Sequence, residues 1–263
     1  MQDWRSYDGV AETYERIHAG RFVDVEKDLL ELSRLQPNDR VLDVGTGTGA
    51  GIEAAEQAGA WATGIDASYP MVAEGRRVHP TLRLAAAEAV DLPFRDGSFD
   101  VVTANFVVAH FTKAETALHD MLRVLRPAGR VAISSWSDGR DTFADAWREM
   151  IETVVPRAML EPTYGRAVPG HDRFAKRDEL EKLFLDAGLR HVRSEPRRYR
   201  WIYGVDDYVD GLAVFATGRF VRQMLGDGEW SGFLDRAKAT FRERFADPLN
   251  DFRDVLLCVG KKE

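Results

Sequence analysis

A glycine-rich segment, Val41–Gly49 (VLDVGTGTG), holds the residues whose types and spacing best suit ligand binding. An apolar run that leads into alternating glycines predicts a strand and a turn whose backbone amides can approach a ligand, because no Cβ stands in the way. Gly45, Gly47 and Ala50 also satisfy a dinucleotide-binding pattern. Asp43 argues against a dinucleotide, because a carboxylate so close to the turn would repel a pyrophosphate and attract a cation.

S-adenosylmethionine (SAM) provides such a cation, since its methionine part carries an ammonium group and a neighbouring sulfonium. Asp66 ends a second predicted strand, 21 residues after Gly45, where a carboxylate can accept hydrogen bonds from the two ribose hydroxyls of an adenosine. NAD needs the same contact, so Asp66 does not separate the two ligands. Met71 is expected either to cover a face of the adenine or to pack in the core.

Three further segments, taken with the glycine turn, resemble one family of enzymes. Residues 87–94 (AEAVDLPF) lead into 95–100 (RDGSFD), residues 7–14 read YDGVAETY, and residues 123–130 read RVLRPAGR. In this order and spacing, the chain resembles the class I SAM-dependent methyltransferases, in particular the branch that contains the quinone-biosynthesis enzymes. The resemblance covers roughly residues 7–136, and only general features agree beyond it.

The resemblance implies a set of residues around SAM. Glu88 matches the acidic residue that binds the adenine amino group, with glutamate in place of the more common aspartate, and Ala89 matches the amide that meets a ring nitrogen. Asn105 and Phe106 are implied near the methionine end, and the lack of prolines there disfavours the subclass that methylates exocyclic amines of bases or amide nitrogens. Tyr7 and Tyr14 are expected either to close over the cofactor or to dock an amphipathic helix. The full set expected to bind the cofactor is Tyr7, Tyr14, Asp43, Gly45, Thr46, Gly47, Asp66, Ala67, Met71, Glu88, Ala89, Asn105, Phe106 and His110.

His110 is the candidate for a catalytic base, because an imidazole can take up a proton near pH 7. The alternative interpretation is that His110 orients the cofactor or packs against it. A base is needed only if the acceptor must lose a proton, since most of the acceleration of methyl transfer can come from alignment and the exclusion of water. Trp136, at the end of the fifth predicted strand, is expected to form a wall of the acceptor pocket.

Strands that alternate with helices predict parallel βαβ units covered by helices on both faces. The expected fold class is α/β: a Rossmann-like, doubly wound, seven-stranded and mostly parallel sheet with a helical cap over the substrate mouth. A single domain is expected overall. Within it, residues 1–136 hold N-terminal lid helices and the SAM-binding core, and residues 137–263 add the cap insertions and the last two strands.

The sequence pattern also predicts where each element lies. One segment, Pro156–Phe174, contains three prolines and two glycines and is expected to be a loop or lid. The resemblance implies that the last strand is antiparallel. The predicted strands are 41–44, 61–65, 82–85, 99–103, 130–136, 191–203 and 254–259, and the predicted helices are 7–35, 51–58, 68–78, 113–125, 143–155, 177–187, 205–225 and 231–245.

The composition limits the kinds of partner. The 263 residues carry a formal net charge of −7, which disfavours nucleic acid as a substrate, and the basic run 190–200 is expected to be a solvated strand face. Cys258 is the only cysteine, so no disulfide can form within the chain. No metal-ligand spacing, apolar span or signal peptide is visible. We therefore expect a cytoplasmic monomer or homodimer with no metal and no membrane partner.

Together these patterns predict an enzyme that transfers a methyl group from SAM to O, N or C of a small organic acceptor, with S-adenosylhomocysteine as the second product. Three alternatives stay open. One is a SAM-binding protein of the same fold that carries out non-methyl chemistry, such as a cyclase. The others are an NAD(P)-dependent Rossmann oxidoreductase and a non-catalytic SAM-binding module, which would expose an apolar surface in place of an enclosed pocket.

Overall fold

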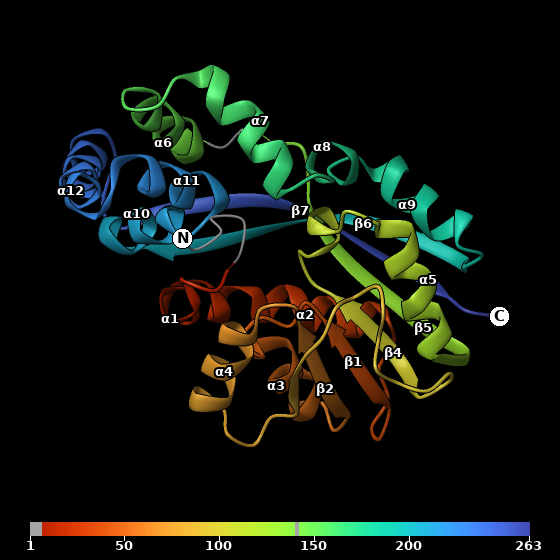
Figure 1. Ribbon diagram of the computed structural model, residues 1–263. Coiled ribbons are helices and arrows are strands. Elements are labelled where there is room, and N and C mark those ends of the chain that lie inside the picture. The colour runs from red at the N-terminus through yellow and green to blue at the C-terminus, as the bar shows by residue number, and fades with distance from the viewer. Residues whose placement is uncertain (1–6, 140–141) are drawn as a thin grey trace.

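One seven-stranded sheet runs through the protein in the order β3-β2-β1-β4-β5-β7-β6 (Figure 1). The computed structural model describes residues 7–139 and 142–263. Neighbouring strands pair in parallel except β7, which is antiparallel to both β5 and β6. This confirms the doubly wound α/β class and the antiparallel last strand. The strands are β1 (Arg40–Val44), β2 (Trp61–Asp66), β3 (Leu84–Ala86), β4 (Phe99–Ala104), β5 (Leu125–Trp136), β6 (Arg190–Tyr203) and β7 (Leu249–Lys261).

Helices cover both faces of the sheet, because alternate residues of its buried strands point to opposite sides. Leu42, Val102 and Ile133 belong to the core beneath α5 and α9, whereas Val41 and Val101 belong to the core beneath α2, α3 and α4. The helices are α2 (Gly20–Leu32), α3 (Ala50–Gln57) and α4 (Tyr69–Val78) on one face, and α5 (Ala114–Val124) and α9 (Arg177–Asp186) on the other.

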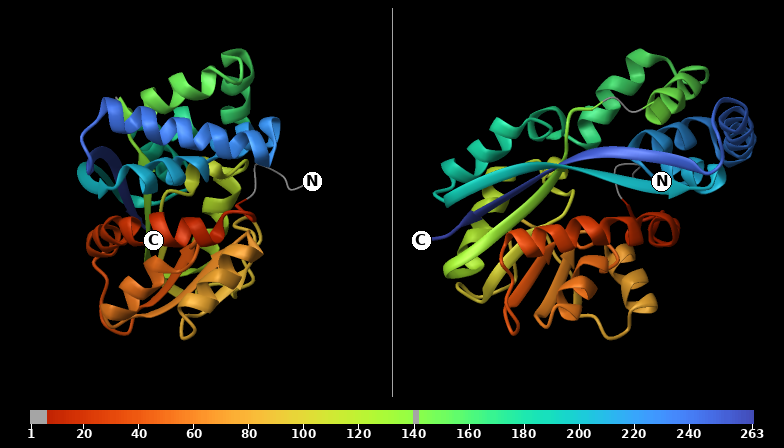
Figure 2. Two further views of the ribbon diagram at one scale, coloured as in Figure 1. Left: turned by 90° about the vertical axis from the view of Figure 1, so that its left-hand side faces the viewer. Right: turned by 180° about the vertical axis from the view of Figure 1, so that it is seen from behind.

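The N-terminal segment is helical, as predicted, but its helix begins later and changes pitch. It comprises α1 (Ala11–Tyr14), a π-helical turn η1 (Glu15–Ala19) and α2. This continuous rod lies between α3 and the long β6–β7 strands (Figures 1 and 2). The predicted lid also includes residues 1–6, which lie outside the described residues.

The cap is built from two insertions that lie together on one side of β6 and β7 (Figure 2). The first leaves β5, and the second connects β6 with β7. The cap helices are α6 (Thr142–Glu152), α7 (Arg157–Ala167) and α8 (His171–Phe174) in the first insertion, and α10 (Val205–Ala213), α11 (Ala216–Leu225) and α12 (Asp227–Arg244) in the second.

The prediction of a loop over Pro156–Phe174 is wrong, because most of this segment forms α7 and α8. Pro156 precedes the first turn of α7, where helix N–H groups have no carbonyl partner anyway. Pro162 removes one hydrogen bond inside the helix. Burial of Leu160 and Thr163 on the same helix holds it in place despite that loss.

Several predicted boundaries also move. The single helix expected over 205–225 is two helices, and a Cβ on Gly218 would lie only 2.5 Å from the carbonyl oxygen of Ala213, which shows how tightly the chain turns between them. The helix expected from Ser231 begins at Asp227 instead. Strand β5 begins at Leu125, ahead of the predicted start at 130, and β7 begins at Leu249, ahead of the predicted start at 254.

Surface and composition features complete the description. The predicted basic run lies on β6, where Arg198 pairs with Asp254 and Arg190 with Glu263, and its arginines are largely exposed. Within residues 7–139 and 142–263, no helix combines the length and the apolar character that a membrane crossing requires. The same residues contain no group of three or more His, Cys, Asp or Glu arranged to hold a metal ion.

Candidate functional site

The glycine turn after β1 is locked to its neighbouring strand. Gly45 has a positive φ of 76°, and a Cβ on it would lie 2.5 Å from Val107 Cγ2, so both backbone conformation and space require glycine there. The amides of Gly45 and Thr46 both donate to the carbonyl oxygen of Ile65 on β2, at 2.8 and 2.9 Å. These bonds hold the turn at the carboxyl end of the sheet.

Two further amides of the turn also donate to acceptors within the protein. The Gly47 amide donates to Asp66 Oδ2 at 2.9 Å, and the Gly49 amide donates to the Thr46 carbonyl at 3.0 Å. A dinucleotide site presents such N–H groups to its phosphates. Because four of them here already have acceptors, the turn is poorly suited to a pyrophosphate.

Asp66 lies at the end of β2 with each carboxylate oxygen accepting one backbone amide. Oδ2 accepts from Gly47, and Oδ1 accepts from the Ser68 amide at 2.8 Å. Each oxygen keeps a further lone pair with which to accept another hydrogen bond. Burial raises the pKa of Asp66, while the two amides lower it and the nearby Asp8 and Glu88 carboxylates add to the rise.

The residues predicted for the adenine lie beside Asp66. The Ala87 amide donates to the Asp66 carbonyl oxygen at 3.0 Å, which brings the segment after β3 next to the end of β2. Glu88 is exposed and Ala89 is half-buried. Met71 is buried at the start of α4, and its Cε would lie 3.5 Å from a Cβ on Gly47. Met71 therefore both packs in the core and borders the turn. Ala67, another residue predicted to bind the cofactor, is exposed.

Asp43 lies under the turn, with only 3% of its surface exposed. The Thr103 hydroxyl on β4 donates to Asp43 Oδ1 at 3.0 Å. Burial raises the pKa of Asp43 to about 6, although hydrogen bonds from Thr46 and Thr103 lower it. The neighbours of Asp43 thus compensate its negative charge only in part, and a cation placed beside it would stabilise the charged form.

Two aromatic rings lie near the turn, that of Tyr14 in the N-terminal rod and that of Tyr7 just before the rod. A Cβ on Gly47 would lie 3.4 Å from Cε1 of Tyr14. Tyr7 packs edge-on against Tyr14 and against His110, with ring centroids 6.0 and 5.9 Å apart, and the guanidinium of Arg219 lies 4.4 Å from the Tyr7 ring centroid. The two predicted tyrosines thus lie together, between the glycine turn and the cap.

Asn105 and Phe106, at the end of β4, are fixed by Ser134 on β5. The Ser134 hydroxyl donates to Asn105 Oδ1 at 2.5 Å and accepts from the Phe106 amide at 2.8 Å. Asn105 Nδ2 donates to the Phe22 carbonyl on α2 at 3.2 Å. Phe106 has a positive φ of 57°, which is uncommon for a non-glycine residue and is a feature of functional sites.

Trp136 belongs to a cluster of aromatic rings at the same end of the sheet. It stacks on Phe106 with centroids 4.2 Å apart, and Phe22 and Trp201 lie edge-on to it at about 6 Å (6.1 and 6.0 Å). The Arg253 guanidinium lies 4.8 Å from the Trp136 ring centroid. This aromatic cluster, formed by Phe22, Phe106, Trp136 and Trp201, is a flat-sided apolar surface beside Asn105.

His110 ends a short 3₁₀-helix, η2 (Val108–His110), and faces Tyr7. Burial lowers the pKa of His110 to about 4, partly offset by the backbone of Ala167. The imidazole is therefore neutral at pH 7. A neutral ring can accept a proton, but such a low pKa makes it a weak base.

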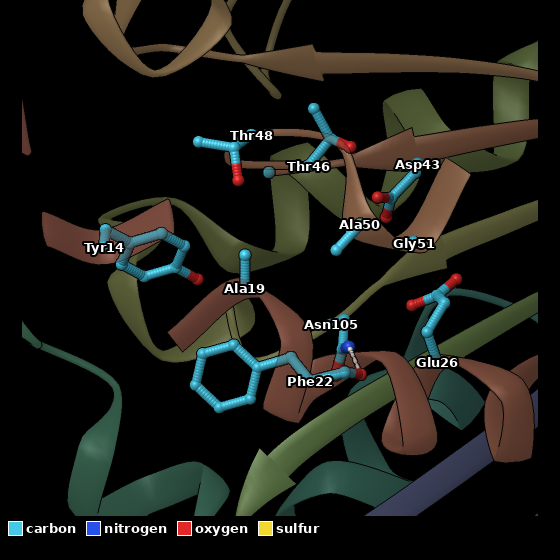
Figure 3. Close-up of a pocket in the computed structure, with 11 residues that line it drawn as sticks. Tyr14, Ala19, Phe22, Glu26, Asp43, Thr46, Thr48, Ala50, Gly51 and Asn105 are labelled. Carbon is cyan, nitrogen blue, oxygen red and sulfur yellow. Dashed lines mark hydrogen bonds between the residues drawn. The ribbon is translucent and has the colours of Figure 1, made fainter. Parts of the chain in front are cut away.

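A pocket lies between the rod and the glycine turn (Figure 3). Tyr14 and Phe22 lie on one side of it, and Asp43, Thr46 and Thr48 lie on the other. The volume of this partly open pocket is about 30 Å³, which leaves room for about one or two water molecules. Its lining joins the predicted residues Tyr14, Asp43, Gly45, Thr46 and Asn105 with the unpredicted Ala19, Phe22, Glu26, Thr48, Ala50 and Gly51.

Glu26 is the most informative of the residues that sequence reasoning missed. It is a carboxylic acid on the buried face of α2, between Val25 and Leu29. A charged residue inside the apolar stripe of a helix was the signal that could have found it.

Comparison with known proteins agrees with this geometry. A family model described as a methyltransferase domain matches residues 42–133. The demethylmenaquinone methyltransferase of Beutenbergia cavernae is 42% identical over 198 residues, which are 75% of this chain and 68% of that protein. Haemonchus contortus phosphoethanolamine N-methyltransferase 2, solved with S-adenosylhomocysteine, matches with a TM-score of 0.62 and 18% identity, over 100% of this chain and 60% of that one.

A second solved structure, the cyclase SpnF, matches with a TM-score of 0.56 and 18% identity, over 91% of this chain and 81% of that one. At such identities the two structures show a shared fold and no more. The Beutenbergia cavernae enzyme is much nearer in sequence, across two thirds of its length. On that similarity and the matching methyltransferase domain, the chain belongs to the class I SAM-dependent methyltransferases.

Proposed function

We propose that this methyltransferase transfers the methyl group of SAM to a small aromatic acceptor bound between the glycine turn and the cap. The observation that carries the proposal is the position of the aromatic cluster. Phe106 and Trp136 stack on each other at the ends of β4 and β5. The residue before Phe106, Asn105, lines the same pocket as Asp43. A flat aromatic acceptor would pack against such rings and leave one edge toward the cofactor.

The chain's own residues provide a complementary site for SAM. The free lone pairs of Asp66 suit the two ribose hydroxyls, and the exposed Glu88 carboxylate suits the adenine amino group, next to the Ala89 amide. Asp43 suits the cationic ammonium. When bound, SAM supplies a methyl group already activated by the positive sulfur.

We assign cofactor binding to the glycine turn and the ends of β2 and β3, and acceptor binding to the aromatic cluster together with the cap. The protein's task is then to align the acceptor with the methyl group and to exclude water, which is worth about 7–11 kcal/mol in favourable cases. The pocket of about 30 Å³ is lined by Asp43 but not by Asp66 or Glu88, so it corresponds to the part of the site where the amino-acid tail of SAM would bind. We propose that Tyr14 and Phe22 move outward to admit that tail. Their return would close the site against water.

The low pKa of His110 bears on how reactive the acceptor atom must be without help from a base. A neutral imidazole with a pKa of about 4 contributes little as a proton acceptor at pH 7. We infer that the acceptor atom is nucleophilic without strong base assistance, as the ring of an electron-rich aromatic compound or its ionised hydroxyl would be. The name of the Beutenbergia cavernae relative makes demethylmenaquinone, in its reduced form, the first compound to test.

The test uses purified protein, SAM with a labelled methyl group, and a panel of reduced demethylmenaquinone analogues, simple phenols and amines. We expect label transfer to an aromatic acceptor with one S-adenosylhomocysteine released per product. Product without S-adenosylhomocysteine would instead indicate a cyclase-type reaction. Binding of NAD with no binding of SAM would overturn the proposal altogether.

A further inference from the structure

Glu26 is a buried carboxylic acid with no evident structural task. Only 1% of its surface is exposed, and neither Oε1 nor Oε2 has a hydrogen-bond partner among the described residues. Burying a carboxyl group without a partner is costly, so such a group in a folded protein calls for an explanation. Its place in the pocket lining offers one.

The side chain of Glu26 points toward the same spot as that of Asp43. A Cβ on Gly51 would lie 2.9 Å from Asp43 Oδ2 and 3.0 Å from Glu26 Cδ, so both carboxyl groups border one point beside α3 (Figure 3). Thr103 has a single hydroxyl proton, and it is donated to Asp43. Glu26 is thus left facing the pocket beside another acid.

Such a pair favours a cation between its members. Burial, followed by the Asp43 charge, raises the pKa of Glu26 well above its usual range, so the pocket favours the protonated form of this acid when no cation is present. The groups that face this pair are Thr103 on β4 and Tyr14 across the pocket, with Asp66 acting on Asp43 from β2. Within residues 7–139 and 142–263 no third acid, histidine or cysteine completes a metal site.

We propose that Glu26 is a second acidic ligand, beside Asp43, for the ammonium group of SAM. The proposal rests on the proposed binding of SAM at the glycine turn. As the cation enters, the O–H bond of the Glu26 carboxyl breaks and the proton passes to solvent. An ammonium N–H then donates to the carboxylate that remains. SAM binding to the protonated acid therefore releases a proton, and the affinity for SAM increases as the pH rises.

Calorimetric titration tests this with two probes: SAM, and 5′-methylthioadenosine, which has the adenosine part but no amino-acid tail. In Glu26→Gln we expect SAM affinity to fall by roughly tenfold to a hundredfold, the worth of a hydrogen bond to a charged group. The affinity for 5′-methylthioadenosine should not change. The matched control is Glu31→Gln, the same change on the exposed side of α2, which should bind both probes normally.

The outcomes separate this role from the proposed function. Wild-type protein that binds no SAM would overturn both. Wild-type affinity for SAM in Glu26→Gln, or an equal loss for both probes, would overturn the role of Glu26 alone. A second measurement needs no variant: titrations of the wild type in buffers of different ionisation enthalpy should show proton release with SAM and none with 5′-methylthioadenosine. Equal proton exchange with the two probes would contradict the proposal.

Discussion

Replacing Asp66 with alanine is expected to raise the dissociation constant for SAM by about a hundredfold. In the structure each carboxylate oxygen already accepts one backbone amide, from Gly47 at 2.9 Å and from Ser68 at 2.8 Å. One further lone pair on each oxygen remains available for the ribose hydroxyls. Two hydrogen bonds to a charged group, each worth about 1.5 kcal/mol at the low end, sum to about 3 kcal/mol, which is about two powers of ten.

The same substitution should leave the fold intact. Asp66 is only half-buried, so water can take over the Gly47 and Ser68 amides, and the repulsion between Asp66 and the nearby Asp8 and Glu88 charges disappears. We expect an unchanged circular dichroism spectrum and a modest change in unfolding midpoint.

Calorimetric titration with S-adenosylhomocysteine is the direct assay, because this ligand keeps the ribose but does not react. Asp91→Ala is a suitable control, since it removes an exposed carboxylate from the neighbouring segment without touching the end of β2. An affinity in Asp66→Ala within threefold of wild type would refute the ribose assignment. So would an equal loss in the Asp91→Ala control.

Three other substitutions test separate parts of the site. His110→Ala should lower cofactor affinity and turnover together, because a neutral ring with a pKa of about 4 serves better as a packing group than as a base; a kcat/KM limb between about pH 6 and 7 that the substitution removes would contradict this. Gly45→Ala should destabilise the protein by more than the roughly 1–2 kcal/mol of a left-handed backbone, since its Cβ would also meet Val107 at 2.5 Å. Adding Val107→Ala should recover part of that loss in urea unfolding, and no recovery would show that the contact is unimportant. Trp136→Ala should raise KM for the acceptor and leave the SAM dissociation constant unchanged, because Trp136 stacks on Phe106 beyond the glycine turn; parallel changes in both constants would place Trp136 with the cofactor instead.

The strand, turn and helix around Gly45 were predictable because their signals are local. The turn at Gly45 needs a residue without a Cβ, and both β1, which leads into the turn, and β4, which pairs with β1, are short apolar runs that are buried on both faces. Asp43 and Asp66 then follow from their distance to that turn along the sequence. Where the neighbours of a residue in space are also its neighbours in the sequence, the spacing of residues along the chain is enough to predict which of them lie close together.

The cap was less predictable because tertiary packing overrides local preference there. The prolines of 156–174 indicated a loop, yet burial of Leu160 and Thr163 supports a helix across Pro162. Glu26 was missed for a related reason. Its neighbours Val25 and Leu29 indicate a packing face, and only the approach of β1 shows that an acid on that face meets the pocket.

The second cap insertion has a consequence for how the fold can diversify. Tyr203, the last residue of β6, is the register partner of Leu249, the first of β7, so α10–α12 depart from and return to adjacent points. The insertion is thus topologically a large hairpin loop. We expect that such a module can be lengthened, shortened or exchanged among relatives without a change in the order or pairing of the strands. New acceptor preferences can then evolve while the nucleoside end of the enzyme stays unchanged.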